Sequence, residues 1–168
     1  QVERVPFIGA REAALANGLM TPSDAAAFHR QRLAEHPQGF GVDVRKRLQA
    51  GAAYSSTDYA LARRMQTLLK RQFAQFLEAY DLLLTPTVPI TAPQRGTADA
   101  VERARLLTRF TAPFNLSGLP ALSVPCGFSK VGLPIGLQLI GNLWTEAKLL
   151  RAACAYEQAR EIDFRIVP

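Results

Sequence analysis

The sequence predicts an α/β protein in which helices flank a central sheet of mixed strand direction. Segments in which apolar residues recur at helical spacing alternate with short apolar runs that are typical of strands. One such run, at residues 82–84, consists of leucine alone, as expected for a strand buried on both faces of an α/β sheet. The length of 168 residues suits one domain with a sizeable core.

The first predicted element is the end of a strand at residues 2–7. Because the chain opens in that strand with Gln1 rather than Met, we expect it to be a piece of a longer protein. No basic stretch followed by an apolar one opens the chain, and no apolar run could span a bilayer, so neither secretion nor a membrane partner is expected. The two cysteines lie far apart and are predicted to be free thiols of a cytoplasmic protein.

Two helices are predicted next. Thr21 can cap the first of them, and Pro22 suits its first helical position. The Pro-Gln-Gly segment at residues 37–39 is expected to end this helix. The second is predicted over residues 42–50, with Gly51 ending it.

The longest predicted helix follows Ser55 and Ser56, where a serine more often caps a helix than acts as a nucleophile. Its apolar residues recur at helical spacing, which predicts a buried stripe rather than a cofactor site. The stripe consists of Leu61, Met65, Leu68, Leu69, Phe73, Phe76 and Leu77.

The second half of the chain is predicted to alternate strands and helices. Asp81 precedes the leucine strand, and Pro86 ends it. The remaining elements are a rigid Pro-rich loop, a helix, two further strands and a last helix capped by Thr145, at residues 87–96, 98–110, 121–125, 133–141 and 145–160.

The net charge is +6, and short basic clusters lie within residues 30–71. A basic surface can attract nucleic acid, but apolar residues at helical spacing interrupt these clusters, and no aromatic platform accompanies them. We therefore expect solvated helix faces rather than a nucleic-acid partner. His29 and His36 have no nearby cysteine and make a poor metal site, so no metal is expected.

Ser117, Ser123 and Cys126 are the candidate nucleophiles in the stretch at residues 114–127, which Gly and Pro interrupt four times. None of them stands in the Gly-x-Ser-x-Gly motif of a nucleophile elbow. Ser123 is expected to be buried in its strand, and Cys126 to act as a small buried hydrophobe. The chain also has no Gly-rich phosphate loop and no paired carboxylates, so no catalytic apparatus is visible.

Four motifs occur in one order: "YDLLLTPTVPITAP", "FTAPFNLSGLPALSVPCG", "GLPIGLQLIG" and "EAKLLRAACAYEQA". Together they resemble the carboxyl-terminal part of the amidase signature family. The resemblance extends upstream through "RKRLQAGAAYSSTDYALARR" to "VERVPF". It implies that residues 1–168 are the carboxyl-terminal part of a single domain with an α/β/α fold, whose members hydrolyse carboxamides or serve as the A subunit of tRNA-dependent amidotransferases.

The family's catalytic groups are a lysine, a serine in a cis peptide and a nucleophilic serine, the latter two in a Gly/Ser-rich stretch that these 168 residues do not contain. No catalytic residue is therefore carried over, no cofactor is expected, and the chain alone is expected to be inactive. By the same resemblance, Ser117, Ser123 and Cys126 belong to a scaffold that connects a helix to a strand, with its turn at Gly118 and Pro120.

Arg47 matches an arginine that lines the substrate pocket in amidotransferase A subunits. On the predicted helix it lies next to the stripe of Val44, Leu48 and Gly51, while Arg45 and Lys46 are expected to point further away. Its guanidinium could bind a carboxylate or a carbonyl oxygen, or its stem could simply cover the core.

Thr87 follows the leucine strand and is a weaker pocket candidate, because ligands gather at the carboxyl ends of strands in open α/β sheets.

Three functions remain open on the sequence. The first is a fragment of a cytoplasmic amidase whose parent binds a small amide substrate. The second is a piece of an amidotransferase A subunit, although the loop at residues 94–104 lacks the Asp-Asp-Pro that this subunit usually shows. The third, a separate binding module, has no support in the sequence. We expect the chain to associate with itself or with the missing amino-terminal part, because a cut sheet leaves an unpaired edge.

Overall fold

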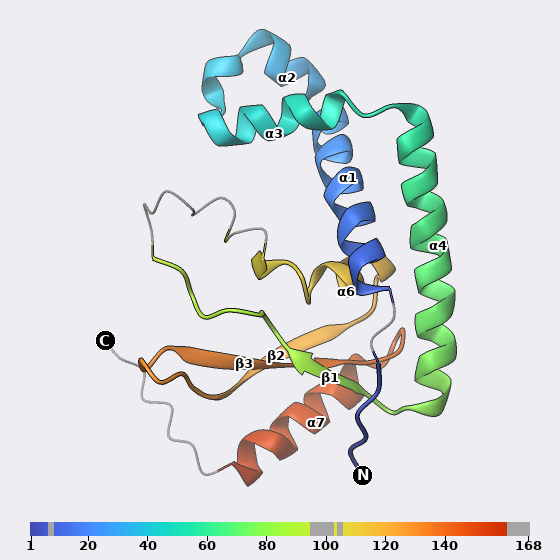
Figure 1. The fold of residues 1–168 in the computed structure, drawn as a ribbon, viewed down its shortest axis with the longest axis vertical. Coiled ribbons are helices and arrows are strands. Elements are labelled where there is room, and N and C mark those ends of the chain that lie inside the picture. The colour runs from blue at the N-terminus through green and yellow to red at the C-terminus, as the bar shows by residue number, and fades with distance from the viewer. Residues whose placement is uncertain (7–8, 95–102, 104–105, 161–168) are drawn as a thin grey trace. The chain divides into compact units, whose positions relative to one another are not determined.

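The computed structural model describes residues 1–6, 9–94, 103 and 106–160. The chain divides into two compact units, residues 1–69 and 70–168, and each is described by itself. In the described part, no helix has both the length and the apolar character needed to cross a bilayer. The elements are α1 (Ala10–Phe28), α2 (Arg30–Glu35), the 3-10 helix η1 (Pro37–Gly39), α3 (Val42–Ala52), α4 (Ser56–Ala79), β1 (Leu83–Pro86), α6 (Ala112–Ser117), β2 (Ala121–Phe128), β3 (Pro134–Ile140) and α7 (Glu146–Ala159), as labelled in Figure 1.

The first helix begins earlier than the sequence predicts. α1 starts at Ala10, not at Thr21, and Pro22 lies inside it. The missing N–H of Pro22 removes one helical hydrogen bond, but the preceding segment is rich in alanine and leucine, which favour a helix strongly enough to carry it across the proline. The strand predicted at residues 2–7 is also wrong for its described part, since residues 1–6 form no strand.

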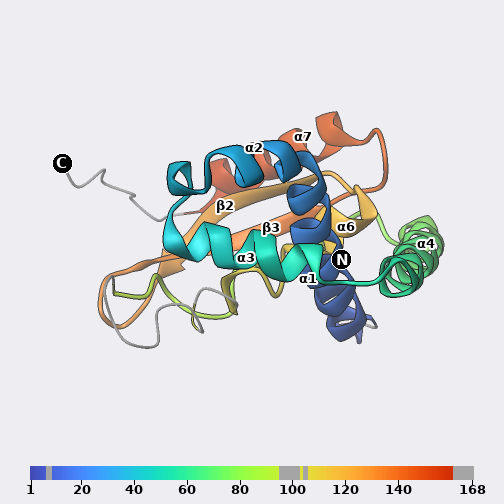
Figure 2. The same ribbon diagram turned by 90° about the horizontal axis from the view of Figure 1, so that it is seen from above.

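The sequence predicts that Gly51 ends α3, but Gly51 lies buried in the last turn of this helix. A Cβ atom placed on Gly51 would lie 2.0 Å from the carbonyl oxygen of Pro22 in α1. The hydroxyl of Ser23 donates to the Gly51 carbonyl at 3.3 Å. α3 thus packs across α1 with backbone against backbone, a contact that only glycine permits (Figure 2).

The start of α4 confirms the prediction that a serine caps this helix. The Ser55 hydroxyl accepts from the Asp58 N–H at 3.0 Å, and the Ser55 N–H donates to the Asp58 carboxylate at 3.1 Å. This reciprocal pair is a capping box with Asp in place of Glu. The hydrogen bonds from Ser55 lower the pKa of Asp58. Part of the predicted stripe is buried, whereas Leu61 and Leu68 are exposed.

The strands of the second unit form a three-stranded sheet in the order β1-β3-β2, and both pairings are antiparallel. The α/β class is confirmed. The parallel pairing that a mixed sheet needs is not found among the described strands. β1 is not buried on both faces within the described residues either, because Leu84 is 42% exposed while Leu83 is 8% exposed.

One face of this sheet packs against α7 (Figures 1 and 2). Val124 of β2 and Leu139 of β3 form a buried cluster with Leu149 and Ala153 of α7. Because side chains alternate along a strand, Ser123, Gly136 and Gln138 point to the opposite face.

The connection between α6 and β2 is as predicted. Gly118 follows α6 with φ 76°, and the strand begins at Ala121. Of the helix predicted at residues 98–110, residues 98–102 and 104–105 lie outside the described residues, while Arg103, Leu106 and Leu107 are helical.

α7 begins after Thr145, as predicted, but the Thr145 hydroxyl donates to the Asn142 carbonyl instead of capping the helix. Lys148 of α7 pairs with Asp81 at 2.5 Å and lowers the pKa of that carboxyl. In the loop before α7, Trp144 has φ 63° and is 91% exposed.

Candidate functional site

A polar feature of the second unit is a pair of hydroxyls that lies over the central strand of the sheet. The Thr87 Oγ1 and Ser123 Oγ atoms lie 2.6 Å apart, and either can donate to the other. Thr87 directly follows β1, and its N–H donates to the Gly136 carbonyl at 2.9 Å. The two hydroxyls thus come from the two outer strands and meet over β3.

Gly136 makes room for this pair. A Cβ atom at that position would lie 2.6 Å from Thr87 Oγ1 and 2.8 Å from Ser123 Oγ, which is closer than real Cβ contacts allow. Close packing therefore explains the glycine at this position, because any larger residue would displace the hydroxyls.

Gln138 lies two residues further along the same face of β3 and is 3% exposed. Its Nε2 donates to Thr85 Oγ1 and to the Phe110 carbonyl, at 3.0 Å each. A buried amide with two such partners ties three segments of the chain together. It holds the end of β1 and the segment before α6 against the central strand.

The structure corrects the prediction for Ser123 and agrees with the one for Ser117. Ser123 is exposed rather than buried, because the described residues leave this part of its face uncovered. Ser117 is buried, and its hydroxyl donates to the Phe114 carbonyl at 3.2 Å, as expected of a scaffold residue. Cys126 is a free, half-buried thiol.

Gly136 and Gln138 were not predicted as site residues. An isolated glycine within a strand is a signal of close approach and could have drawn attention to Gly136. Gln138, a polar residue in an otherwise apolar strand, is a weaker signal of the same kind.

Arg47 lies on α3 in the first unit, whereas Thr87 lies in the second, and each is placed only within its own unit. Leu48 and Gly51 are buried on α3, but Val44 is 43% exposed, so the predicted stripe is shorter than expected. Arg47 is exposed, and Arg45 is half-buried. The expectation that Arg45 points further from the core than Arg47 is therefore wrong.

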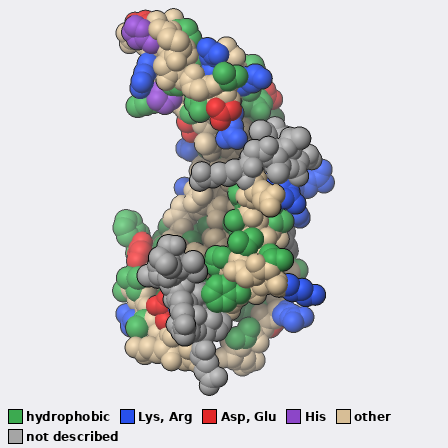
Figure 3. All heavy atoms as spheres, turned by 90° about the vertical axis from the view of Figure 1, so that its left-hand side faces the viewer, with side chains coloured by type: hydrophobic (Ala, Val, Ile, Leu, Met, Phe, Trp, Pro, Cys, Tyr) green, Lys and Arg blue, Asp and Glu red, His purple; other side chains and the backbone are tan. Residues whose placement is uncertain are grey.

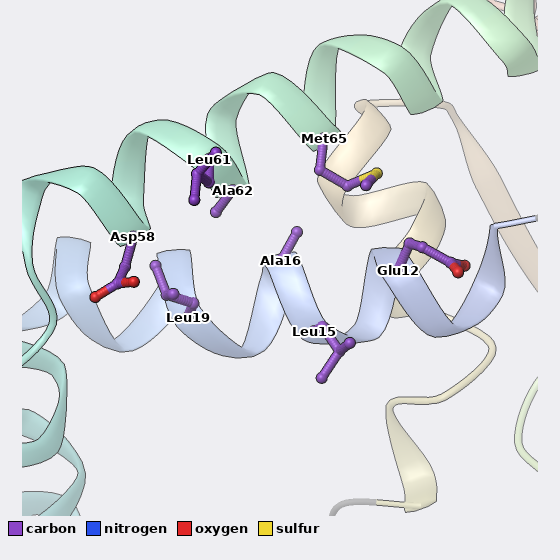
Figure 4. Close-up of a pocket in the computed structure, with 8 residues that line it drawn as sticks. All are labelled: Glu12, Leu15, Ala16, Leu19, Asp58, Leu61, Ala62 and Met65. Atoms are coloured by element: carbon purple, nitrogen blue, oxygen red, sulfur yellow. The ribbon is translucent and has the colours of Figure 1, made fainter.

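A shallow apolar groove of about 260 Å³ lies between α1 and the first half of α4 (Figure 4). Leu15, Leu19, Leu61 and Met65 contribute its apolar walls, and the carboxylates of Glu12 and Asp58 stand at its margins. Asp58 is already engaged by Ser55. The groove offers apolar contact but no arrangement of nucleophile and base.

The basic clusters of the first unit do not form one continuous patch on the face drawn in Figure 3. Around the two histidines, lysine and arginine side chains are interspersed with hydrophobic and acidic ones. Within the described ranges, no group of three or more His, Cys, Asp or Glu side chains could hold a metal ion.

Comparison with known proteins gives consistent matches. A protein-family model described as Amidase matches residues 7–150. The A subunit of glutamyl-tRNA(Gln) amidotransferase from Prochlorococcus marinus (strain MIT 9211) is 48% identical over 131 residues, which are 74% of this chain and 27% of that protein. The protein of the same name from Moorella thermoacetica is 46% identical over 134 residues, 76% of this chain and 27% of that protein.

Solved structures agree with these matches. A crystal structure of an amidase is 30% identical with a TM-score of 0.81, and it matches 90% of this chain and 36% of its own. The A subunit of glutamyl-tRNA(Gln) amidotransferase from Thermotoga maritima is 31% identical with a TM-score of 0.76, over 98% of this chain and 36% of its own. The chain spans 27% of the length of the two curated relatives. The family match over most of its residues shows that the chain belongs to the amidase signature family.

Proposed function

We propose that these residues are part of a cytoplasmic enzyme that hydrolyses the C–N bond of a small carboxamide with a serine, cis-serine and lysine mechanism. The observation that carries the proposal is the family match over residues 7–150. The two catalytic serines belong to the family's Gly/Ser-rich stretch, which is not among these 168 residues, and none of the lysines here lies in a matching motif. The 168 residues contribute sheet strands, outer helices and part of one wall of the substrate pocket to this enzyme.

Arg47 and Thr87 are the residues that we propose for this wall. The exposed guanidinium of Arg47 is free to approach a carboxylate or carbonyl oxygen, and its bidentate geometry suits both. The Thr87 hydroxyl is fixed at the end of β1 by Ser123, and its backbone is fixed by Gly136. Both residues would act by binding and orienting the amide, because neither is a nucleophile with an adjacent base.

The test of the pocket role is Arg47→Ala in the full-length protein, with Lys46→Ala as the matched control on the same exposed turn. Loss of an arginine that binds substrate should lower kcat/KM about 10-fold or more, since a charge-assisted hydrogen bond contributes about 1.5–3 kcal/mol. Thermal stability should stay unchanged. Equal kinetics of both variants and the unaltered protein would leave Arg47 a surface residue only.

A second candidate function is that of an amidotransferase A subunit. It is favoured by the identities of 48% and 46% to proteins of that name. Against it stands the absence of Asp-Asp-Pro after the Pro-rich loop, in a stretch that lies largely outside the described residues. The full-length protein distinguishes the two: an amidase hydrolyses simple amides alone, whereas an amidotransferase subunit needs its partner subunits and a charged tRNA for its main reaction.

We further propose that the chain associates with itself or with an amino-terminal part of the same domain. In the described residues β1 and β2 each pair only with β3, so each leaves one strand edge unpaired. The exposed apolar side chains Leu143, Trp144 and Phe128 of the second unit support the same proposal. Light scattering of the purified chain tests it, and a monomer at high concentration that also fails to bind the amino-terminal part would contradict it.

The 168-residue chain alone is proposed not to hydrolyse amides. The measurement is ammonia release from a panel of simple amides. Turnover that disappears on Ser117→Ala, Ser123→Ala or Cys126→Ala would show that the chain carries its own nucleophile and would refute this part of the proposal.

A further inference from the structure

The hydroxyl pair over Gly136 can form further hydrogen bonds besides the one within the pair. Each hydroxyl carries one donor and two acceptor lone pairs. Once one hydroxyl has donated to the other, at 2.6 Å, the pair still holds one O–H to donate and several lone pairs that can accept. Ser123 is exposed and Thr87 is half-buried, so this capacity is accessible from the open part of the sheet face.

The pair is also preorganised. Thr87 is held by the Gly136 carbonyl through its N–H, and the strand just before it is held by Gln138 through Thr85. Because Gly136 has no side chain, the two hydroxyls have room to meet over β3. Groups fixed in this way lose little conformational entropy when they bind a ligand.

The surroundings of the pair define what it could bind. The residues that build it, Thr85, Thr87, Ser123, Gly136 and Gln138, are all uncharged. An uncharged site offers no opposite charge to offset the free-energy cost of desolvating a carboxylate. It suits a neutral group that has both hydrogen-bond donors and acceptors. A primary carboxamide is such a group, with two N–H donors and one carbonyl acceptor.

We propose that the Thr87–Ser123 hydroxyl pair is a binding subsite for the neutral carboxamide group of the substrate, and that Gln138 is the positioning residue that holds this end of the sheet. The inference rests on the proposed function, because an amide substrate is what brings a carboxamide to this face.

The experiment measures equilibrium binding of succinamide, a neutral diamide, to the 168-residue chain by NMR shifts of the Ser123 and Gly136 backbone amides. Ser123→Ala and Thr87→Val each remove one hydroxyl and should weaken binding about 5- to 10-fold. Ser123→Thr keeps a hydroxyl and should bind within about 3-fold of the unaltered chain. Ser117→Ala, which removes a hydroxyl elsewhere in the same unit, is the matched control and should bind as the unaltered chain does.

Three results would overturn the inference: no binding of succinamide by the unaltered chain, unchanged affinity in both Ser123→Ala and Thr87→Val, or equal weakening by Ser117→Ala. A merely structural pair would lower stability in these variants without changing affinity in the folded chain. Hydrolysis of succinamide by the full-length protein is measured separately. Binding that depends on the pair without any hydrolysis would refute the proposed function alone, whereas hydrolysis without such binding would refute the subsite alone.

Discussion

On the face of the sheet that packs against α7, β2 and β3 contribute Val124 and Leu139, which are 5% and 3% exposed. On the opposite face the same strands carry Ser123, which is next to Val124 and is exposed, and Gly136, which is half-buried. A shift of one residue along a strand therefore separates packing from polar chemistry, because successive side chains point to opposite faces. The comparison indicates that changes at the buried Val124 and Leu139 act on stability, whereas changes at the exposed Ser123 act on binding.

The largest effect is expected for Leu139→Ala on the α7 face. Truncation of a leucine that is 3% exposed leaves a cavity between β3 and α7, which should cost about 2–5 kcal/mol of unfolding free energy. Urea unfolding monitored by circular dichroism measures it. Leu150→Ala on α7, where the side chain is 61% exposed, is the matched control and should stay within about 0.5 kcal/mol. Similar losses in the two variants would mean that α7 does not seal this face.

Gln138→Leu should have the next largest effect, and it lies on the hydroxyl face. The change keeps the volume but removes the hydrogen bonds to Thr85 and to the Phe110 carbonyl. Loss of these two hydrogen bonds, whose partners Thr85 and Phe110 are half-buried, should cost about 1–3 kcal/mol in total. The same urea titration applies, with Gln158→Leu at an exposed position of α7 as control. A neutral outcome would show that the three segments are held together by packing alone.

Gly136→Ala should destabilise the chain less, by about 1–2 kcal/mol, because the added methyl group meets the ends of two side chains that can rotate away. Its effect on the hydroxyl pair should be larger than its effect on stability, since the Cβ atom would lie only 2.6 Å from Thr87 Oγ1 and 2.8 Å from Ser123 Oγ. Loss of succinamide binding in a chain that still folds is the expected result. Succinamide binding that persists in Gly136→Ala would mean that the subsite does not depend on the Thr87–Ser123 hydroxyl pair.

The smallest effect concerns the ion pair that joins α7 to the start of β1. Lys148 holds the pKa of Asp81 below its ordinary value of 3.8, so the folded chain binds this proton less readily than the unfolded chain. The resulting stabilisation is present above about pH 5 and is lost as the pH falls through the lowered pKa of Asp81. The stability difference between the unaltered chain and Asp81→Asn should therefore shrink as the pH falls below 3.8 and vanish once Asp81 is protonated in the folded chain. A difference that persists there would point to a contact other than the charge.

Local patterns predict the longest helix and the last helix from apolar residues at helical spacing, and the three strands of the sheet from short apolar runs. The start of α1 was missed, since Thr21 and Pro22 resemble a helix start and nothing local shows that alanine-rich sequence carries the helix past them. Gly51 was misinterpreted for a different reason. Its role depends on the Pro22 carbonyl, a contact between residues far apart in the sequence.

The candidate site was predicted in part. The end of a strand points to Thr87, but Ser123 is predicted to be buried because alternation along an apolar strand is expected to turn it inward. Alternation shows which residues share a face, whereas it does not show what packs on that face. The hydroxyl pair also joins residues 36 positions apart, which spacing along the chain cannot reveal.

The contact of Gly51 with Pro22 also sets the direction in which α3 presents its basic residues. The backbones of α3 and α1 touch at Gly51, where there is no side chain. Rotation of α3 about its own axis would bring a side chain against the Pro22 carbonyl, so this contact fixes the orientation of α3 about its axis. Arg47 lies four residues before Gly51, and each residue of a helix adds about 100° of rotation. A single insertion between the two would swing the guanidinium by that angle while leaving the helix and the charge unchanged. Gly51 thus fixes the direction in which the Arg47 side chain leaves the helix.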